Sequence, residues 1–191
     1  MAKTLRTFIA VEVTRAAREQ AARLIRELAG TPAAVKWVEP ENLHLTLKFL
    51  GEVDMRQSAA VCQAVRTAVA ELDVFTFHLH GAGAFPSSDQ PRTLWVGVDD
   101  GQEDLIQLHD NVEAALAPLD FRSDGRRFVP HMTIGRVRYG RRGVAELGAE
   151  IESHADVDLG PVPVREVIVY SSELTRNGPY YEALDRAPLA G

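Results

Sequence analysis

Two stretches of the chain share one alternating pattern of polar and apolar residues. Each reads histidine, apolar, threonine, apolar, and they begin at His44 and at His131. Successive side chains of a β-strand point to opposite faces, so Thr46 shares a face with His44, and Thr133 shares one with His131. Each stretch is therefore expected to be a strand with an apolar back and an imidazole-hydroxyl front. Two copies in distant parts of the chain are far less easily produced by chance than one.

The remaining pattern predicts helices and strands in alternation. β-Branched apolar runs indicate strands, and apolar stripes at a helical spacing indicate helices. Strands are expected at residues 7–13, 36–38, 44–51, 75–80, 93–98, 131–134, 164–170 and 180–184, and helices from about residues 14, 54, 100 and 144. A helix follows each His-Thr strand. This order predicts an α+β fold of two similar lobes in one domain, residues 1–191, with the two His-Thr strands facing each other across a cleft.

Local signals predict several boundaries of these elements. Thr14 and Asp54 are suited to cap the first two helices. Asp100 and Glu103 have the spacing of a capping box at the start of the third helix. Asn177-Gly178 is a turn signal that predicts a hairpin between the last two strands.

Length and composition are those of an ordinary soluble globular protein. The 191 residues are 46% hydrophobic and 25% charged, which is enough for a large core. The apolar run at residues 7–13 is too short to span a bilayer, and no signal peptide is recognisable. The single cysteine, Cys62, excludes an intrachain disulfide, is expected in the core, and fits a reducing cytoplasm. A monomer without membrane contact is expected.

The net charge of −6 argues against a general nucleic-acid coat, but the charge is unevenly distributed. Between residues 122 and 142 there are seven arginines and one acid, Asp124. This segment brackets His131, and arginine binds phosphate through paired hydrogen bonds. The cluster therefore indicates an anionic substrate, with a solvated arginine-rich loop as the alternative. The arginines are Arg122, Arg126, Arg127, Arg136, Arg138, Arg141 and Arg142.

The other histidines are expected to be structural. His78 and His80 should face outward together from one strand, as a polar strand face or as a metal pair without an evident third ligand. His109 is expected at the surface. His154 lies near a predicted helix end, where a positive charge complements the helix dipole.

Two His-Thr pairs in one pocket can carry out acid-base chemistry on a phosphodiester. Histidine titrates near pH 6.5, so one imidazole can be neutral and the other protonated at neutral pH. One ring would take a proton from the nucleophile, and the other would protonate the leaving oxygen. The threonine hydroxyls would bind non-bridging phosphate oxygens. This chemistry needs no metal and no cofactor. The alternative is a pair of unrelated strands whose histidines form ordinary structural hydrogen bonds and take no part in catalysis.

The residues around both patterns resemble a known family. Residues 41–51 (Glu-Asn-Leu-His-Leu-Thr-Leu-Lys-Phe-Leu-Gly), residues 128–136 (Phe-Val-Pro-His-Met-Thr-Ile-Gly-Arg) and the opening residues 6–10 are similar to the two-histidine (2H) phosphoesterases. Among these, they resemble the bacterial and archaeal RNA 2′,3′-cyclic phosphodiesterases, also called 2′-5′ RNA ligases. The resemblance covers nearly the whole chain.

The resemblance implies two pseudo-symmetric lobes, each with an antiparallel sheet and flanking helices, around a central water-filled groove. It also implies metal-independent opening of RNA 2′,3′-cyclic phosphate ends to 2′-phosphate ends, or the joining of RNA ends through a 2′-5′ bond. By the same resemblance, His44 would be the acid for the 3′ leaving oxygen and His131 the base for water. Thr46 and Thr133 would hold the phosphate.

The resemblance further implies that Phe49 and Arg136, each five residues beyond a motif histidine, sandwich the terminal base. In an ideal strand this odd spacing would place both on the apolar back, where an unpaired arginine is costly. A bend or bulge is therefore predicted, helped by Gly135. The alternative for Phe49 is a core position.

Three other functions remain open at the level of sequence. The substrate could be a small cyclic nucleotide or an ADP-ribose cyclic phosphate. The protein could instead be a nucleotide- or RNA-binding module without turnover. It could also be a metal-binding protein using His44, His131 and Glu41, although no further ligand lies at a suitable spacing.

Overall fold

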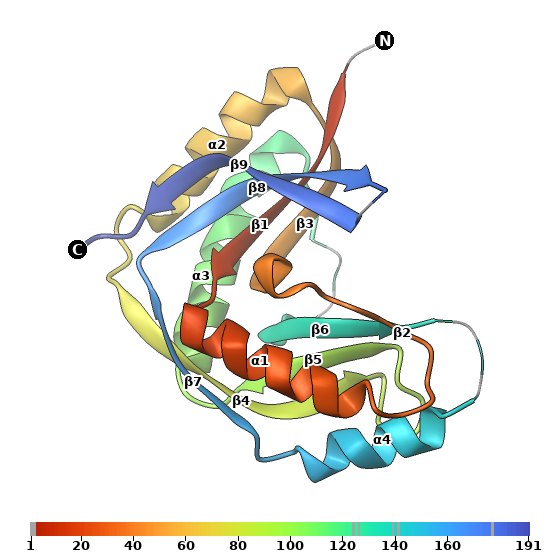
Figure 1. The fold of residues 1–191 in the computed structure, drawn as a ribbon. Coiled ribbons are helices and arrows are strands. Elements are labelled where there is room, and N and C mark those ends of the chain that lie inside the picture. The colour runs from red at the N-terminus through yellow and green to blue at the C-terminus, as the bar shows by residue number, and fades with distance from the viewer. Residues whose placement is uncertain (1–2, 124, 126, 139, 141, 177) are drawn as a thin grey trace.

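The computed structural model describes residues 3–123, 125, 127–138, 140, 142–176 and 178–191 (Figure 1). The strands are β1 (Thr4–Glu12), β2 (Val35–Trp37), β3 (His44–Asp54), β4 (Phe75–Phe85), β5 (Thr93–Val98), β6 (His131–Val137), β7 (Asp158–Val164), β8 (Glu166–Thr175) and β9 (Gly178–Pro188). The α-helices are α1 (Arg15–Leu28), α2 (Met55–Val69), α3 (Gln102–Leu116) and α4 (Val144–Ser153). Two short 3-10 helices, η1 (Pro40–Asn42) and η2 (Ala117–Leu119), complete the described elements.

All nine strands join one curled antiparallel sheet, in the order β7-β4-β5-β6-β3-β1-β8-β9, with β2 paired to β6. The boundary between β6 and β3 divides this order into two halves of four strands, β7-β4-β5-β6 and β3-β1-β8-β9. β6 and β3, which carry the two motifs, are the innermost strands of the two halves. The α+β, two-lobed arrangement predicted from the sequence is therefore confirmed. The sheets of the two lobes are continuous, because Leu45 of β3 pairs with Met132 of β6.

α2 and α3 pack on one half of the sheet, and α1 and α4 lie on the other half. α2 and α3 pack against each other and against β3, and in Figure 1 they lie side by side behind the lobe that contains β1 and β3. α1 contacts β7 and α4 in the other lobe. None of the helices in the described ranges is long and apolar enough to cross a membrane.

The sequence predicted the first two helices well. α1 buries the expected apolar stripe, and the Thr14 hydroxyl accepts a hydrogen bond from the Ala17 amide at 3.1 Å. Asp54 caps α2 by accepting from the Arg56 amide at 2.9 Å. Cys62 is only half-buried at the edge of the core, whereas Val61 is fully buried. The expectation that Cys62 belongs to the core is thus met in part.

The predicted capping box of the third helix is wrong. α3 begins after Gly101, which adopts φ = 75° and has no capping side chain. The Asp100 carboxylate instead accepts a hydrogen bond from the Gly101 amide at 3.0 Å. Glycine enters the left-handed region without steric cost, so a tight turn replaces the side-chain cap.

Strand β7 was missed by the sequence pattern, which placed one run from Val164 onward. Pro161 and Pro163 lie within β7 and argue locally against a strand. β7 lies at one edge of the sheet and pairs with β4 alone among its described neighbours. An edge strand tolerates proline, because its outward side needs no ladder donor.

His109 is also not the plain surface residue that was expected. Its ring stacks on Phe128 with centroids 4.2 Å apart and planes 3° from parallel, and its side chain is 13% exposed. The ring therefore helps to pack the segment that leads to β6. Asp124, Arg126, Arg141 and Asn177, which entered the sequence predictions, lie outside the described residues.

Candidate active site

The two motif strands have the same succession of buried and exposed positions. From His44 in β3 and from His131 in β6, seven residues read half-buried, buried, half-buried, buried, buried, exposed, half-buried. The two consecutive buried positions break the alternation of a regular strand. The two strands thus share a local irregularity as well as a sequence motif.

The pairing of the two strands brings both motifs to one face. Leu45 and Met132 are antiparallel partners, so the same register places His44 opposite Thr133 and Thr46 opposite His131. Directly opposite residues share a face, so the two histidines are diagonal neighbours in this register, and such neighbours in a regular antiparallel pair are about 7–8 Å apart. This spacing lets both rings approach one group lying between them. We call this side of β3 and β6 the front face.

Each histidine is oriented by a backbone carbonyl two residues earlier. His44 Nδ1 donates to the Asn42 carbonyl oxygen at 2.7 Å, and His131 Nδ1 donates to the Val129 carbonyl oxygen at 2.7 Å. A carbonyl oxygen can only accept, so Nδ1 carries the proton in the neutral ring. Nε2 is therefore the atom of each ring available for proton transfer.

Both histidines have a lowered pKa. Burial lowers the pKa of His44 to about 4, against the opposing effect of the hydrogen bond to Asn42, and the nearby Arg18 lowers it further. Burial also lowers the pKa of His131, and Arg136 adds to this effect. Burial disfavours the charged imidazolium, as does a neighbouring positive charge. The lowered pKa values favour the neutral form of both rings in the free protein, whereas the sequence allowed one neutral and one protonated ring.

A bulge in β3 brings Phe49 to the front face. Ala10 pairs with Thr46 but Ile9 pairs with Lys48, so β3 contains one extra residue and its alternation is reset. Phe49 then pairs with Phe8 and is 61% exposed. The sequence predicted no separate bulge in this strand, and the alternative core position of Phe49 is wrong.

β6 contains the corresponding bulge. Trp95 pairs with Thr133 but Leu94 pairs with Gly135, so Arg136 is brought to the side of Thr133. Arg136 is exposed, and its Nη1 donates to the Thr93 hydroxyl at 3.1 Å. The bulge predicted near Gly135 is therefore confirmed. Whether Phe49 and Arg136 stack on a base stays a prediction.

An aromatic cluster surrounds His44 that the sequence did not predict. The Phe8 ring stacks on the imidazole with centroids 4.9 Å apart, and Tyr181 meets it edge-on at 5.5 Å. Tyr170 stacks on Phe8 at 5.2 Å, and its ring centroid lies 6.5 Å from that of His44. These residues come from β1, β8 and β9, so only the long-range strand pairing brings them to His44.

The surroundings of His131 are less aromatic. Phe85 meets its ring edge-on at 5.1 Å, and Trp95 lies 5.1 Å from Phe85. Trp95 stands beside Thr133, and a Cβ at Gly83 would come within 2.2 Å of its ring. Glycine at position 83 is thus needed for the indole to lie flat against β4.

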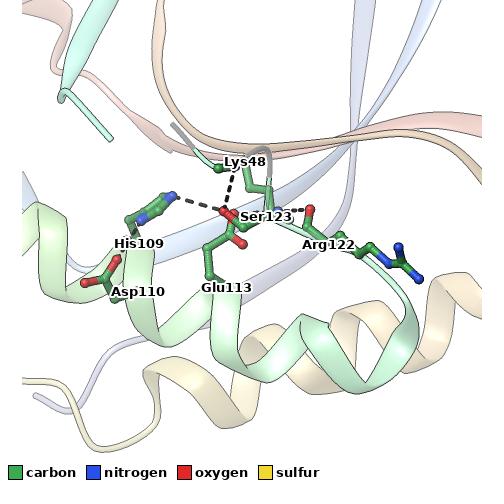
Figure 2. A network of polar contacts seen from close by, with 7 residues as sticks. Lys48, His109, Asp110, Glu113, Arg122 and Ser123 are labelled. Atoms are coloured by element: carbon green, nitrogen blue, oxygen red, sulfur yellow. Dashed lines mark hydrogen bonds and ion pairs between the residues drawn. The ribbon is translucent and has the colours of Figure 1, made fainter. Parts of the chain in front are cut away.

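The bulge in β3 also buries a lysine (Figure 2). Lys48 is 7% exposed, and its Nζ donates to the Glu113 carboxylate at 2.5 Å and to the Arg122 carbonyl oxygen at 3.1 Å. His109 Nε2 lies 3.6 Å from the same carboxylate. This network links β3 to α3 and to the segment before β6. The corresponding position in β6 is Gly135, where a Cβ would come within 2.8 Å of the Trp37 ring.

The arginine-rich segment contributes less to the site than the sequence indicated. Of the five cluster arginines within the described residues, all are exposed, and Arg136 is the one whose charge acts on His131. A different arginine, Arg18 of α1, acts on His44. The sequence offered no signal for it beyond its place in the first turns of a helix that follows β1.

The structure gives no support to a metal site. In the part of the chain that it describes, no group of three or more His, Cys, Asp or Glu side chains is arranged to hold a metal ion. His78 and His80 instead face acids, at 2.7 Å from Asp158 and 3.8 Å from Asp99. At its helix end, His154 Nδ1 donates to the Glu150 carbonyl oxygen at 2.8 Å, as its predicted place there allows.

A cavity of about 370 Å³ opens beside His44. It lies between the first turns of α1, the η1 segment and the hairpin of β8 and β9. Its polar lining includes Arg18, Arg186 and Glu12.

Comparison with known proteins agrees with this architecture. A family model described as the 2′-5′ RNA ligase superfamily matches residues 10–172, and the chain belongs to that family. Proteins called RNA 2′,3′-cyclic phosphodiesterase from Aeropyrum pernix and Archaeoglobus fulgidus are similar to it. The first is 38% identical, over 85% of this chain and 91% of that protein. The second is 37% identical, over 94% of this chain and 98% of that protein.

Solved structures show the same fold. A Thermus thermophilus protein superposes with a TM-score of 0.80 at 25% identity, over 97% of this chain and 98% of that chain. Escherichia coli LigT in complex with 3′-AMP superposes with a TM-score of 0.74 at 26% identity, over 99% of this chain and all of that chain. The fold of this chain is thus that of the LigT-like two-histidine phosphoesterases, as the sequence predicted.

Proposed function

We propose that this protein hydrolyses RNA 2′,3′-cyclic phosphate ends to 2′-phosphate ends by histidine acid-base catalysis without a metal ion. The observation that carries the proposal is the register of β3 and β6, which directs both His-Thr pairs to one face. Membership of a family whose relatives are named for this activity supports the same substrate. We also expect the protein to act as a monomer in the cytoplasm.

In the proposed reaction, a water molecule attacks phosphorus opposite to the 3′ oxygen. Nε2 of His131 takes a proton from the water as the new P–O bond forms, and Nε2 of His44 gives a proton to the 3′ oxygen as its bond to phosphorus breaks. The products are a 2′-phosphate and a 3′-hydroxyl. The hydroxyls of Thr46 and Thr133 donate to the non-bridging oxygens, where negative charge accumulates.

The lowered pKa values agree with the role of His131 as a base, whereas they require that the substrate promotes protonation of His44 before it can act as an acid. A neutral His131 can act as a base without first losing a proton. His44 must be protonated to act as an acid, and burial opposes this in the free protein. A bound phosphate anion raises the pKa of an imidazole that it contacts, so the substrate itself would promote protonation of His44.

Phe49 and Arg136 would hold the terminal base between an aromatic ring and a guanidinium plane. Their exposure on the front face, which two matched bulges produce, supports this role. The same site could join RNA ends if the 5′-hydroxyl of a second RNA replaced water, and the family to which the chain belongs favours this as a second activity.

The decisive experiment is product analysis with an RNA oligonucleotide that ends in a 2′,3′-cyclic phosphate. We expect a 2′-phosphate end, formed equally well in excess chelator. A 3′-phosphate product would contradict the assignment of the leaving oxygen, and loss of activity with chelator would contradict metal independence. Binding without turnover would indicate an RNA-binding module. Faster turnover of 2′,3′-cyclic mononucleotides than of oligomers would make small nucleotides the substrate.

A further inference from the structure

The cavity beside His44 is large enough to hold part of a substrate. Its volume of about 370 Å³ lies within the range typical of small-molecule sites. His44 itself forms part of the lining, together with Tyr180 and Tyr181 of β9. A molecule bound at His44 could therefore extend into the cavity along an aromatic wall.

Arg18 is an unpaired cation in this cavity. Its Nε is buried without a hydrogen-bond partner, and within the described ranges its guanidinium makes no ion pair. A buried donor that lacks a partner is costly, so such groups are usually satisfied by protein, water or a ligand. Arg18 thus has hydrogen-bonding capacity that the described residues leave unused.

The acids of the cavity do not neutralise Arg18. Glu12 accepts a hydrogen bond from the Tyr170 hydroxyl at 2.7 Å and lies 3.5 Å from Arg186. Arg186 also pairs with Glu166 outside the cavity. Glu41, the other acid in the lining, is exposed to solvent. The charge of Arg18 therefore remains available to an incoming anion.

We propose that Arg18 binds a second phosphate of the RNA, the one on the 5′ side of the terminal nucleoside, while the cyclic phosphate lies between His44 and His131. The inference rests on the proposed function, because the position of the cyclic phosphate defines which phosphate reaches the cavity. Arginine suits the role, since its guanidinium binds phosphate through two parallel hydrogen bonds. Tyr180 and Tyr181 would line the path of the preceding nucleoside. The site would make the enzyme prefer a chain over a nucleoside.

The test compares two substrates that differ by one phosphate. Adenosine 2′,3′-cyclic phosphate is assayed beside the same compound with a 5′-phosphate, with wild-type protein and with Arg18→Ala, Arg18→Lys and Arg15→Ala. Arg15 is the matched control, because it lies on the same helix, is exposed and pairs with Glu19. We expect Arg18→Ala to lower kcat/KM about 10- to 100-fold more for the 5′-phosphorylated substrate than for the other, mainly through KM, because any effect of Arg18 on His44 is common to both substrates. Arg18→Lys should retain part of the preference, and Arg15→Ala all of it.

Two results would overturn the inference. An equal loss on both substrates would mean that Arg18 acts through His44, and no loss on either would mean that it contacts no phosphate. If wild-type protein turns over neither substrate, the oligonucleotide with a 2′,3′-cyclic phosphate end tests the proposed function separately. In that case, calorimetric binding of adenosine 2′,5′-bisphosphate and adenosine 2′-phosphate tests the second site. Arg18→Ala should weaken the binding of the bisphosphate and leave the binding of the monophosphate unchanged. Equal affinity of wild-type protein for the two ligands would reject the second site.

Discussion

β3 and β6 are alike in geometry and different in electrostatic surroundings. Each presents a histidine whose Nδ1 donates to a carbonyl oxygen at 2.7 Å, and each contains a bulge at the same distance from that histidine. Yet His44 stacks on Phe8, and its pKa is lowered to about 4, whereas His131 faces the exposed Arg136. The repeated backbone geometry thus places two equivalent imidazoles in unequal surroundings, and the proposed reaction would use them for opposite proton transfers.

The most direct way to break this comparison is to remove each imidazole in turn. His44→Ala and His131→Ala should each lower kcat about 10²- to 10⁴-fold, because each removes one proton transfer. Rates on a cyclic-phosphate oligonucleotide measure the effect. His78→Ala is the control, since His78 pairs with Asp158 and lies on β4, which β5 separates from β6, so its loss should leave kcat unchanged. Full activity in either active-site variant would remove that histidine from the mechanism.

The second test uses the position at which the two bulges differ most. Lys48→Met should lower the free energy of unfolding by about 3 kcal/mol, because it leaves the Glu113 carboxylate without its ion-pair partner in a largely buried place. Urea denaturation followed by circular dichroism measures this. Arg15→Ala breaks an exposed pair that solvent screens, and it should leave the free energy of unfolding nearly unchanged. Equal stability of Lys48→Met and wild-type protein would show that the network in Figure 2 adds nothing.

Substitution of Phe49 and of Arg136 tests whether the residues that the two bulges expose contact the same ligand. If both contact the terminal base, Phe49→Ala and Arg136→Ala should each raise KM roughly 10-fold, since stacking on a base contributes about 1–3 kcal/mol. Steady-state kinetics on the oligonucleotide give KM and kcat separately. Exposed Leu174 provides the control, and Leu174→Ala should change neither constant. A KM effect in one variant alone would restrict base contact to one lobe.

The smallest expected effect distinguishes the base from the acid. Activity measured as kcat/KM falls when the base of the free protein becomes protonated, so a lowered pKa extends activity below the usual pH of histidine titration. If His131 is the base, Arg136→Gln removes a charge that lowers its pKa, and the acidic limb should move to higher pH. A limb that moves with Arg18→Gln instead would assign the base to His44 and reverse the two roles.

Local patterns were sufficient to predict the two motif strands and their histidines and insufficient to predict the surroundings of these histidines. The alternation around His44 and His131 depends on neighbouring residues, so it could be recognised in the sequence. Phe8 and Arg18 reach His44 through strand pairing and helix packing, which no local pattern contains. The bulge in β6 could be anticipated, because the role expected of Arg136 conflicted with regular alternation, whereas the bulge in β3 was not predicted.

Some local signals were also misleading. Pro161 and Pro163 argue against a strand unless the strand is known to lie at an edge, which is a property of the whole sheet. Asp100 and Glu103 have the spacing of a capping box, but the left-handed turn at Gly101 takes its place. In both cases a tertiary arrangement decided between two locally acceptable structures.

The carbonyl partners of the two imidazoles make the site resistant to mutation in one respect. A histidine oriented by a carboxylate loses its tautomer when that acid is replaced, and one substitution is sufficient. Here the accepting oxygens belong to the peptide groups of Asn42 and Val129, which every amino acid supplies. The identity of the side chains at these two positions can therefore drift during evolution while the proton on each ring stays in place.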